Sequence, residues 1–193
     1  MVLYLIIINV CVFIIATVTY FCSNLSYFGA LGYTYLATLI VMILDGIVAG
    51  IARSLPKRFA NDDLKIYKVS AKEKNFYEKI KIRRWKDKIP EIGHMTGFRK
   101  NKIEDPNNIE YIDRFLLEIC YGEIGHTLSV FTSYLLLLFF FIHETFIFIA
   151  LPVAFVSSVL NILPILVLRY NFYKLKIVKA VLLKKQALKE KNI

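Results

Sequence analysis

The sequence predicts an all-α integral membrane protein with about four transmembrane helices, a basic amphipathic interfacial helix and a basic C-terminal helix. Its composition is the first reason, because 57% of the 193 residues are hydrophobic, more than a soluble domain of this size normally carries. The same apolar content excludes an intrinsically disordered chain. The second reason is charge segregation: the formal net charge is +10, yet no Lys or Arg precedes Arg53.

Four apolar runs give the predicted spans. Residues 1–22 are long enough to cross a bilayer, which takes about 20 residues, and they lack the positive n-region and cleavage site of a signal peptide. A short polar turn precedes the second span. The third and fourth spans flank His143-Glu144, and Pro152 and Pro164 leave the fourth open to a bent or re-entrant path. The predicted spans are residues 1–22, 31–51, 120–142 and 145–168.

The charged parts of the chain set the predicted orientation. Residues 53–114 hold 17 Lys and Arg against 10 Asp and Glu, and the tail 169–193 holds eight basic residues and one acidic residue. Because positive loops stay in the cytoplasm, we expect both segments and both termini on the cytoplasmic side of the cell membrane. The whole chain, residues 1–193, is then a single multi-pass membrane domain.

Within the cytoplasmic segment, the apolar side chains of residues 73–89 recur at roughly helical spacing, and basic side chains occupy many of the positions between them. This pattern predicts an amphipathic helix lying in the membrane interface, with Trp85 at headgroup depth and Pro90 ending the helix. A basic surface also suits nucleic acid, but a membrane protein meets anionic lipid headgroups first. We therefore predict anionic lipid as a partner and no nucleic acid.

The three cysteines show no paired spacing, and the sequence contains no CxxC or His/Cys metal pattern. We interpret Cys11, Cys22 and Cys120 as small buried apolar residues, and we predict neither a disulfide nor a bound metal.

Ionisable residues inside the apolar runs are the first candidates for function, because a charge in the membrane is costly. Glu123 and His126 share one helix face at a spacing of three residues. Glu123 would orient the imidazole, and His126 would act as a general base toward a hydroxyl. The alternative is a polar cluster that only ties the third span to its neighbours. For Asp45, a functional role and a purely structural role are equally compatible with the sequence. Glu118 is expected to pair with a basic residue of the interfacial helix.

Two further groups lie near the predicted cytoplasmic face. Glu91 and His94 follow the interfacial helix, and Arg169 and Asn171 follow the fourth span. By spacing alone these are an ordinary helix exit and a positive-inside anchor. The predicted topology brings them to the same face as Glu123 and His126, where a lipid substrate enters laterally and a soluble donor arrives from the cytoplasm.

Three sequence blocks carry a resemblance to a known family: Phe76-Tyr77-Glu78-Lys79-Ile80 through Arg84-Trp85-Lys86 to Glu91; Glu118 through Glu123-x-x-His126; and Asn161 through Pro164 to Arg169-Tyr170-Asn171. Together they resemble the glycosyl-4,4′-diaponeurosporenoate acyltransferases. That family acylates the sugar of a glycosylated carotenoid in the staphyloxanthin-type pathway.

The resemblance implies acyl transfer from a thioester donor to a sugar hydroxyl of a membrane glycolipid. His126 would be the base, Glu123 its orienter, and Arg169 with Asn171 would bind the donor phosphate or the developing oxyanion. The resemblance also points to Glu91, and His94 and Trp85 join the expected substrate-binding set because of their position at the predicted membrane interface. No cofactor is expected, since acyl-CoA or an acyl-carrier protein would be the donor substrate. The alternatives are a membrane scaffold that binds anionic lipid or a partner enzyme, and another membrane transferase, for which a cofactor fingerprint is lacking.

Overall fold

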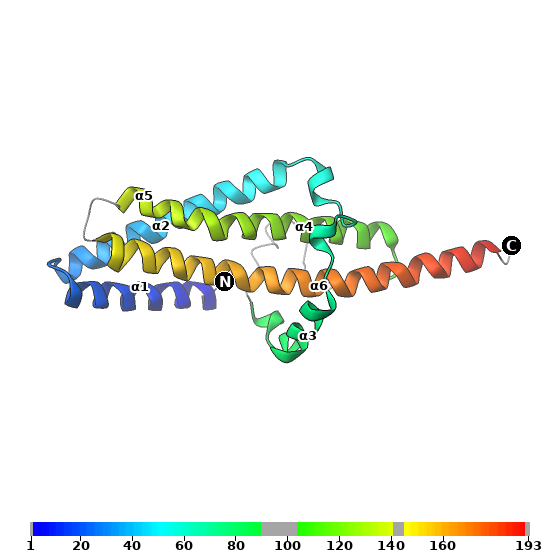
Figure 1. Ribbon diagram of the computed structural model, residues 1–193, viewed down its shortest axis with the longest axis horizontal. Helices are drawn as coiled ribbons and strands as arrows, with labels where there is room; N and C mark the ends of the chain where they lie inside the picture. The colour runs from blue at the N-terminus through cyan, green and yellow to red at the C-terminus, as the bar shows by residue number, and fades with distance from the viewer. Residues whose placement is uncertain (1, 90–103, 141–144, 192–193) are drawn as a thin grey trace. The chain divides into compact units, whose positions relative to one another are not determined.

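The computed structural model describes residues 2–89, 104–140 and 145–191, which form helices and turns without a strand among them. Within this described part, four helical stretches are long and apolar enough to cross a membrane, which confirms the predicted fold class. The principal helices are α1 (Val2–Cys22), α2 (Tyr27–Ser54), α4 (Ile109–Thr132) and α6 (Leu151–Lys191) (Figure 1).

The helix boundaries differ from the predicted spans. Helix α2 begins four residues earlier than the predicted residue 31. A 3₁₀ turn, η6 (Ser133–Leu135), separates α4 from the short helix α5 (Leu136–Phe140). A π turn, η7 (Phe146–Ala150), leads into α6, which then runs unbroken through Pro164 for 41 residues. The fourth apolar run and the basic tail are therefore one continuous helix. The predicted connector His143-Glu144 lies outside the described residues.

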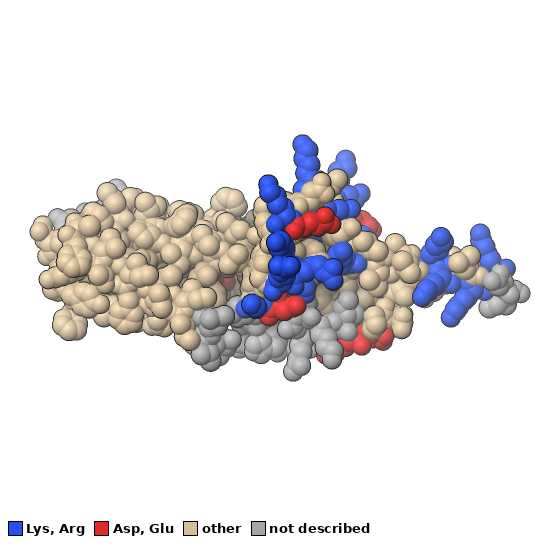
Figure 2. Space-filling model, turned by 90° about the horizontal axis from the view of Figure 1, so that it is seen from below, with Lys and Arg blue, Asp and Glu red and all other residues tan. Residues whose placement is uncertain are grey.

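The chain packs as two compact units, to which α4 and α6 both contribute residues. The first unit comprises residues 1–53 and 124–163, and the second comprises residues 54–123 and 164–193. Arg53 is the one Lys or Arg that the sequence places in the first unit. Figure 2 shows the basic side chains gathered over the 54–123 segment and along the C-terminal part of α6. The segregation of charge in the sequence is thus also a division between packing units.

The first unit has an apolar core and an apolar outer surface. Buried side chains from α1, α2, α5, η7 and the start of α6 pack together: Ile15, Ala37, Val41, Leu136, Phe140, Ile149, Ala150 and Val153. Large apolar side chains such as Phe21 and Ile14 remain exposed on α1, as expected for helix faces that contact lipid. A buried hydroxyl joins two of these elements, because Thr19 donates to the carbonyl of Phe148 at 3.0 Å.

The second unit contains short helical pieces between α2 and α4. They are η1 (Lys57–Ala60), η2 (Lys65–Tyr67), α3 (Ala71–Lys79), η3 (Ile82–Arg84) and η4 (Lys86–Lys88). Ser70 caps α3, because its hydroxyl accepts a hydrogen bond from the backbone N–H of Glu73 at 3.2 Å.

The predicted amphipathic helix over residues 73–89 is wrong in its length, because α3 ends at Lys79. The helix does not continue through Lys81, whose φ of 51° is left-handed and which immediately precedes η3. Two tertiary contacts hold this turn: the indole of Trp85 donates to the carbonyl of Ile80 at 3.0 Å, and Ile82 is buried against Tyr77 and Tyr170. Trp85 packs against the same cluster, so its ring contacts protein near α6.

Candidate active site

A polar cluster lies within the apolar first unit, where three helices each contribute one side chain. His126 comes from α4, Asn161 from α6 and Asp45 from α2. The Nδ1 atom of His126 is 2.9 Å from Oδ1 of Asn161. The amide nitrogen of Asn161 donates to the Ser157 carbonyl at 3.1 Å and approaches Oδ2 of Asp45 at 3.4 Å. Asn161 is buried, whereas His126 and Asp45 are half-buried.

Serine hydroxyls on η6 and α6 extend this cluster. The hydroxyls of Ser133 and Ser157 are 2.9 Å apart, and Ser158 donates to the carbonyl of Val130 at 3.2 Å. Oδ1 of Asp45 is buried and has no hydrogen-bond partner among the described residues. A carboxylate oxygen in this situation is expensive in an apolar helix bundle, which makes the cluster a candidate for function.

The second unit contains an ion triad formed by Glu73, Glu123 and Arg169. The guanidinium of Arg169 grips Glu73 with two hydrogen bonds, Nε to Oε1 at 2.6 Å and Nη2 to Oε2 at 3.0 Å. Its Nη1 donates to Oε1 of Glu123 at 2.5 Å and to the carbonyl of Ile66 at 3.1 Å. The hydroxyl of Tyr77 also donates to Glu73. Arg169 therefore joins α6 to α4 and to the segment around α3.

Two carboxylates share this single guanidinium. Burial raises the pKa of Glu73, but the hydrogen bonds from Arg169 and Tyr77 outweigh it and hold that pKa below its usual value. Oε2 of Glu123 is buried without a hydrogen-bond partner among the described residues. Because Arg169 already carries two carboxylates and a carbonyl, a phosphate reaching it would have to displace one of them.

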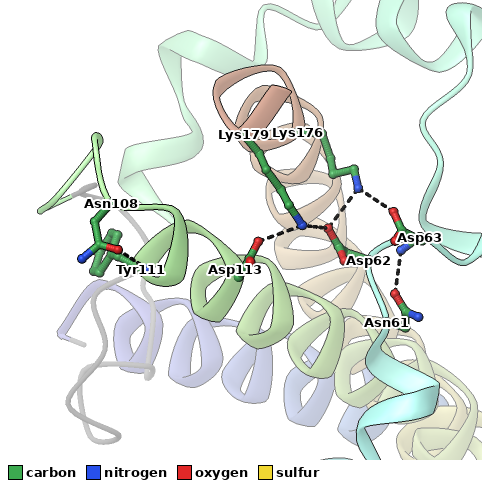
Figure 3. A network of polar contacts seen from close by, with 8 residues as sticks. All are labelled: Asn61, Asp62, Asp63, Asn108, Tyr111, Asp113, Lys176 and Lys179. Atoms are coloured by element: carbon green, nitrogen blue, oxygen red, sulfur yellow. Dashed lines mark hydrogen bonds and ion pairs between the residues drawn. The ribbon is translucent and has the colours of Figure 1, made fainter. Parts of the chain in front are cut away.

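A second ionic network ties residues 61–63 to α4 and α6 (Figure 3). Lys176 donates to Asp62 at 2.9 Å and to Asp63 at 3.0 Å, and Lys179 lies 3.1 Å from Asp62 and 2.8 Å from Asp113. Burial alone would raise the pKa of Asp62. The two lysines lower that pKa by more than burial raises it, so the net shift is downward. The network borders an open cleft of about 740 Å³. Basic and acidic side chains both line this cleft: Lys57, Arg58, Asp62, Asp113, Arg114, Glu118 and Lys179.

The predicted site residues fall into three groups. Glu91 and His94 lie outside the described residues. Glu123 and Arg169 come together in the second unit, where Asn171 is half-buried on α6 two residues beyond Arg169. His126 belongs to the first unit, with Asn161 and Asp45 beside it. Convergence of the whole set on one site stays a prediction. No three His, Cys, Asp or Glu of the described segments lie together as a metal would require.

Two residues in these clusters were missed by the sequence analysis. Asn161, Ser157 and Ser158 are the three polar residues within the apolar stretch 146–168. Their spacing of three and four residues places them on one helix face, a signal that attention to charged residues alone overlooks. Glu73 carries no comparable signal, because its partner Arg169 lies 96 residues away in the sequence.

Comparison with protein families decides the identity. The model of the glycosyl-4,4′-diaponeurosporenoate acyltransferase family matches residues 57–181, well over half of the chain. The chain belongs to this family. As a glycosyl-4,4′-diaponeurosporenoate acyltransferase family member it is an acyltransferase, which confirms the resemblance and the prediction of an enzyme. The matched region includes His126, Glu123 and Arg169 but not Asp45. No curated protein and no solved structure matches the chain.

Proposed function

We propose that this acyltransferase moves a fatty acyl group from a thioester donor to a sugar hydroxyl of a membrane glycolipid, a glycosylated carotenoid or similar, with His126 as the general base. The observation that carries the proposal is the 2.9 Å contact between Nδ1 of His126 and Asn161 inside an apolar helix bundle. Because Asn161 engages Nδ1, Nε2 is the ring nitrogen that we propose as the base.

The proposed reaction needs no covalent enzyme intermediate. Nε2 of His126 accepts the proton of the sugar hydroxyl while the hydroxyl oxygen attacks the thioester carbonyl carbon. The tetrahedral oxyanion collapses, the C–S bond breaks, and the imidazolium returns its proton to the leaving thiolate. The products are an acyl ester of the glycolipid and a free thiol on the donor's carrier, coenzyme A or an acyl-carrier protein. The amino acids alone supply this chemistry, so the proposal includes no cofactor.

Glu123, Arg169 and Asn171 are proposed to support the reaction in different ways. Glu123 was expected to orient His126, but Asn161 engages Nδ1 of the ring and Nε2 is the proposed base, so we propose that Glu123 holds Arg169 in place. Arg169 and Asn171 were expected to bind the donor phosphate or the oxyanion. The engagement of Arg169 by Glu73 and Glu123 favours a positioning role for its guanidinium, and we propose Asn171, half-buried on the same helix, as the hydrogen-bond donor to the substrate.

We also propose a multi-pass location in the cell membrane with both termini in the cytoplasm. The basic second unit would then face the cytoplasmic leaflet, where anionic headgroups attract each nearby Lys or Arg by about 1 kcal/mol. The same positive charge would attract an anionic thioester carrier.

Lipid profiling tests the proposed function. Cells that express the wild-type chain should contain a glycolipid that carries one more fatty acyl ester than the glycolipid of cells without it. His126→Gln should lose this product, because general-base catalysis contributes roughly 10²–10⁴-fold. Glu123→Gln should be milder, since the amide oxygen can still accept a hydrogen bond from Arg169. An unchanged lipidome, or full activity of His126→Gln at equal expression, would instead favour a non-catalytic scaffold.

A further inference from the structure

We infer that Asn161, held in place by Asp45, is the positioning residue for His126: it fixes the imidazole proton on Nδ1 and so leaves the lone pair on Nε2. The inference rests on the proposed function, in which Nε2 is the base. It assigns a role to two residues on helices other than that of His126, and it concerns one packing unit throughout.

The orientation of the Asn161 amide follows from its neighbours. A backbone carbonyl, that of Ser157, lies 3.1 Å from one end of the amide, and a carboxylate oxygen of Asp45 lies 3.4 Å from the same end. A carbonyl and a carboxylate only accept hydrogen bonds, so this end must be the NH₂ group. The opposite end, 2.9 Å from the imidazole, is therefore the amide oxygen.

An amide oxygen only accepts hydrogen bonds, and this property determines the state of the ring. Nδ1 of His126 must carry a proton to form the contact with Asn161. A neutral imidazole has one ring proton, so Nε2 is then unprotonated and basic. The amide thus acts as the carboxylate does in a Ser-His-Asp triad, which holds the histidine in the tautomer that can accept a proton.

Asp45 completes the arrangement in two ways. Its Oδ2 orients the amide of Asn161, and when ionised it places a negative charge beside the residue that holds His126. That charge would stabilise the imidazolium that forms when the base takes its proton. Asp45 is the charged residue that α2 contributes to this cluster. Along the sequence of α4, the charged residue nearest to His126 is Glu123, three positions earlier.

A polar tie between helices would produce the same contacts without any effect on chemistry. The rate of acyl transfer separates the two interpretations, because the contact fixes the tautomer in both, but only a positioning role makes the rate of the folded protein depend on Asn161. Ser133 offers a matched control. Its hydroxyl bonds to Ser157 at 2.9 Å, so Ser133→Ala removes a buried polar contact beside Asn161 without touching the imidazole.

The first experiment is nitrogen-15 NMR of the purified full chain in lipid nanodiscs, with labelled histidine, above the pKa of the ring. The chain has three histidines, and the spectrum of His126→Gln assigns the signal of interest. We expect the wild type and Ser133→Ala to show the Nδ1–H tautomer, and Asn161→Leu to shift toward Nε2–H. An Nε2–H tautomer in the wild type would overturn the inference even if Asn161→Leu does not fold.

The second experiment exchanges the two partners. Asn161→Asp alone sets two carboxylates against each other, and Asp45→Asn alone removes the charge, so each should lower the acyl-transfer rate. The double variant Asp45→Asn, Asn161→Asp restores one carboxylate and one amide, and it should recover at least tenfold over Asn161→Asp. A double variant no faster than Asn161→Asp would contradict the relay. Full activity of His126→Gln would instead overturn the proposed function, and the tautomer spectrum distinguishes that failure from this one.

Discussion

Replacement of Arg169 by Met gives the sharpest test of how the second unit is held together. The substitution keeps a long, flexible side chain but removes the guanidinium that binds Glu73, Glu123 and the carbonyl of Ile66. Both carboxylates would remain where burial is substantial, since the Glu123 and Glu73 side chains are only 9% and 22% exposed.

The expected loss of stability follows from this burial. Removal of one partner from a buried ion pair costs about 3–5 kcal/mol, because the other charge stays uncompensated. The partial exposure of Glu73 and Arg169 argues for the lower end, about 3 kcal/mol. At about 2–4 °C per kcal/mol for a chain of this length, the melting temperature should fall by about 6–12 °C.

Thermal unfolding in detergent, followed by circular dichroism, measures the effect. Arg169→Met combined with Glu73→Gln and Glu123→Gln should recover most of the loss, because no unpaired charge remains. Lys86→Met is the control: its ion pair is with the neighbouring Asp87, whose side chain is 64% exposed, so the change should be small. An Arg169→Met protein that melts within 1 °C of the control, on the order of the exposed-pair effect, would refute the reasoning.

Two other predictions concern the second unit and the membrane orientation. Because Lys176 and Lys179 hold the pKa of Asp62 below its usual value, its ionised form stabilises the fold above the pKa of the unfolded chain, and this contribution is lost as pH falls through the folded pKa. Asp62→Asn should therefore melt below the wild type at pH 7, and the difference in melting temperature should become smaller as the pH is lowered to 3; an equal difference at both pH values would contradict this. A cysteine at Lys185, in a chain freed of its native cysteines, should resist an impermeant thiol reagent in intact cells and react after permeabilisation. Labelling in intact cells would reverse the proposed orientation.

The transmembrane helices were predictable because the signal for a span is local. An apolar run of about 20 residues forms a helix in a membrane whatever its neighbours are, since its backbone must satisfy its own hydrogen bonds. The break at Lys81 was not predictable in this way. The periodicity of residues 73–89 continues across it, and the turn depends on the contact of Trp85 with Ile80 and on burial of Ile82 against Tyr170, a residue almost 90 positions later.

The candidate site was predictable only in part, for a related reason. His126 and Glu123 stand out because titratable groups are rare in apolar runs. Their hydrogen-bond partners in the structure, Asn161 and Arg169, depend on contacts 35 and 46 residues away in the sequence. Spacing along one helix can suggest that two side chains share a face, but it cannot show which other helix supplies the partner.

The central claim, acyl transfer with His126 as the base, is tested most directly in a reconstituted system. Purified protein in liposomes would receive a glycosylated carotenoid acid and a fatty acyl-CoA, and mass spectrometry would follow the acceptor. We predict that the acceptor gains one fatty acyl ester with the wild type, and that His126→Gln lowers the rate by roughly 10²–10⁴-fold while it keeps the helical content. A His126→Gln protein that forms the ester at the wild-type rate would contradict the account.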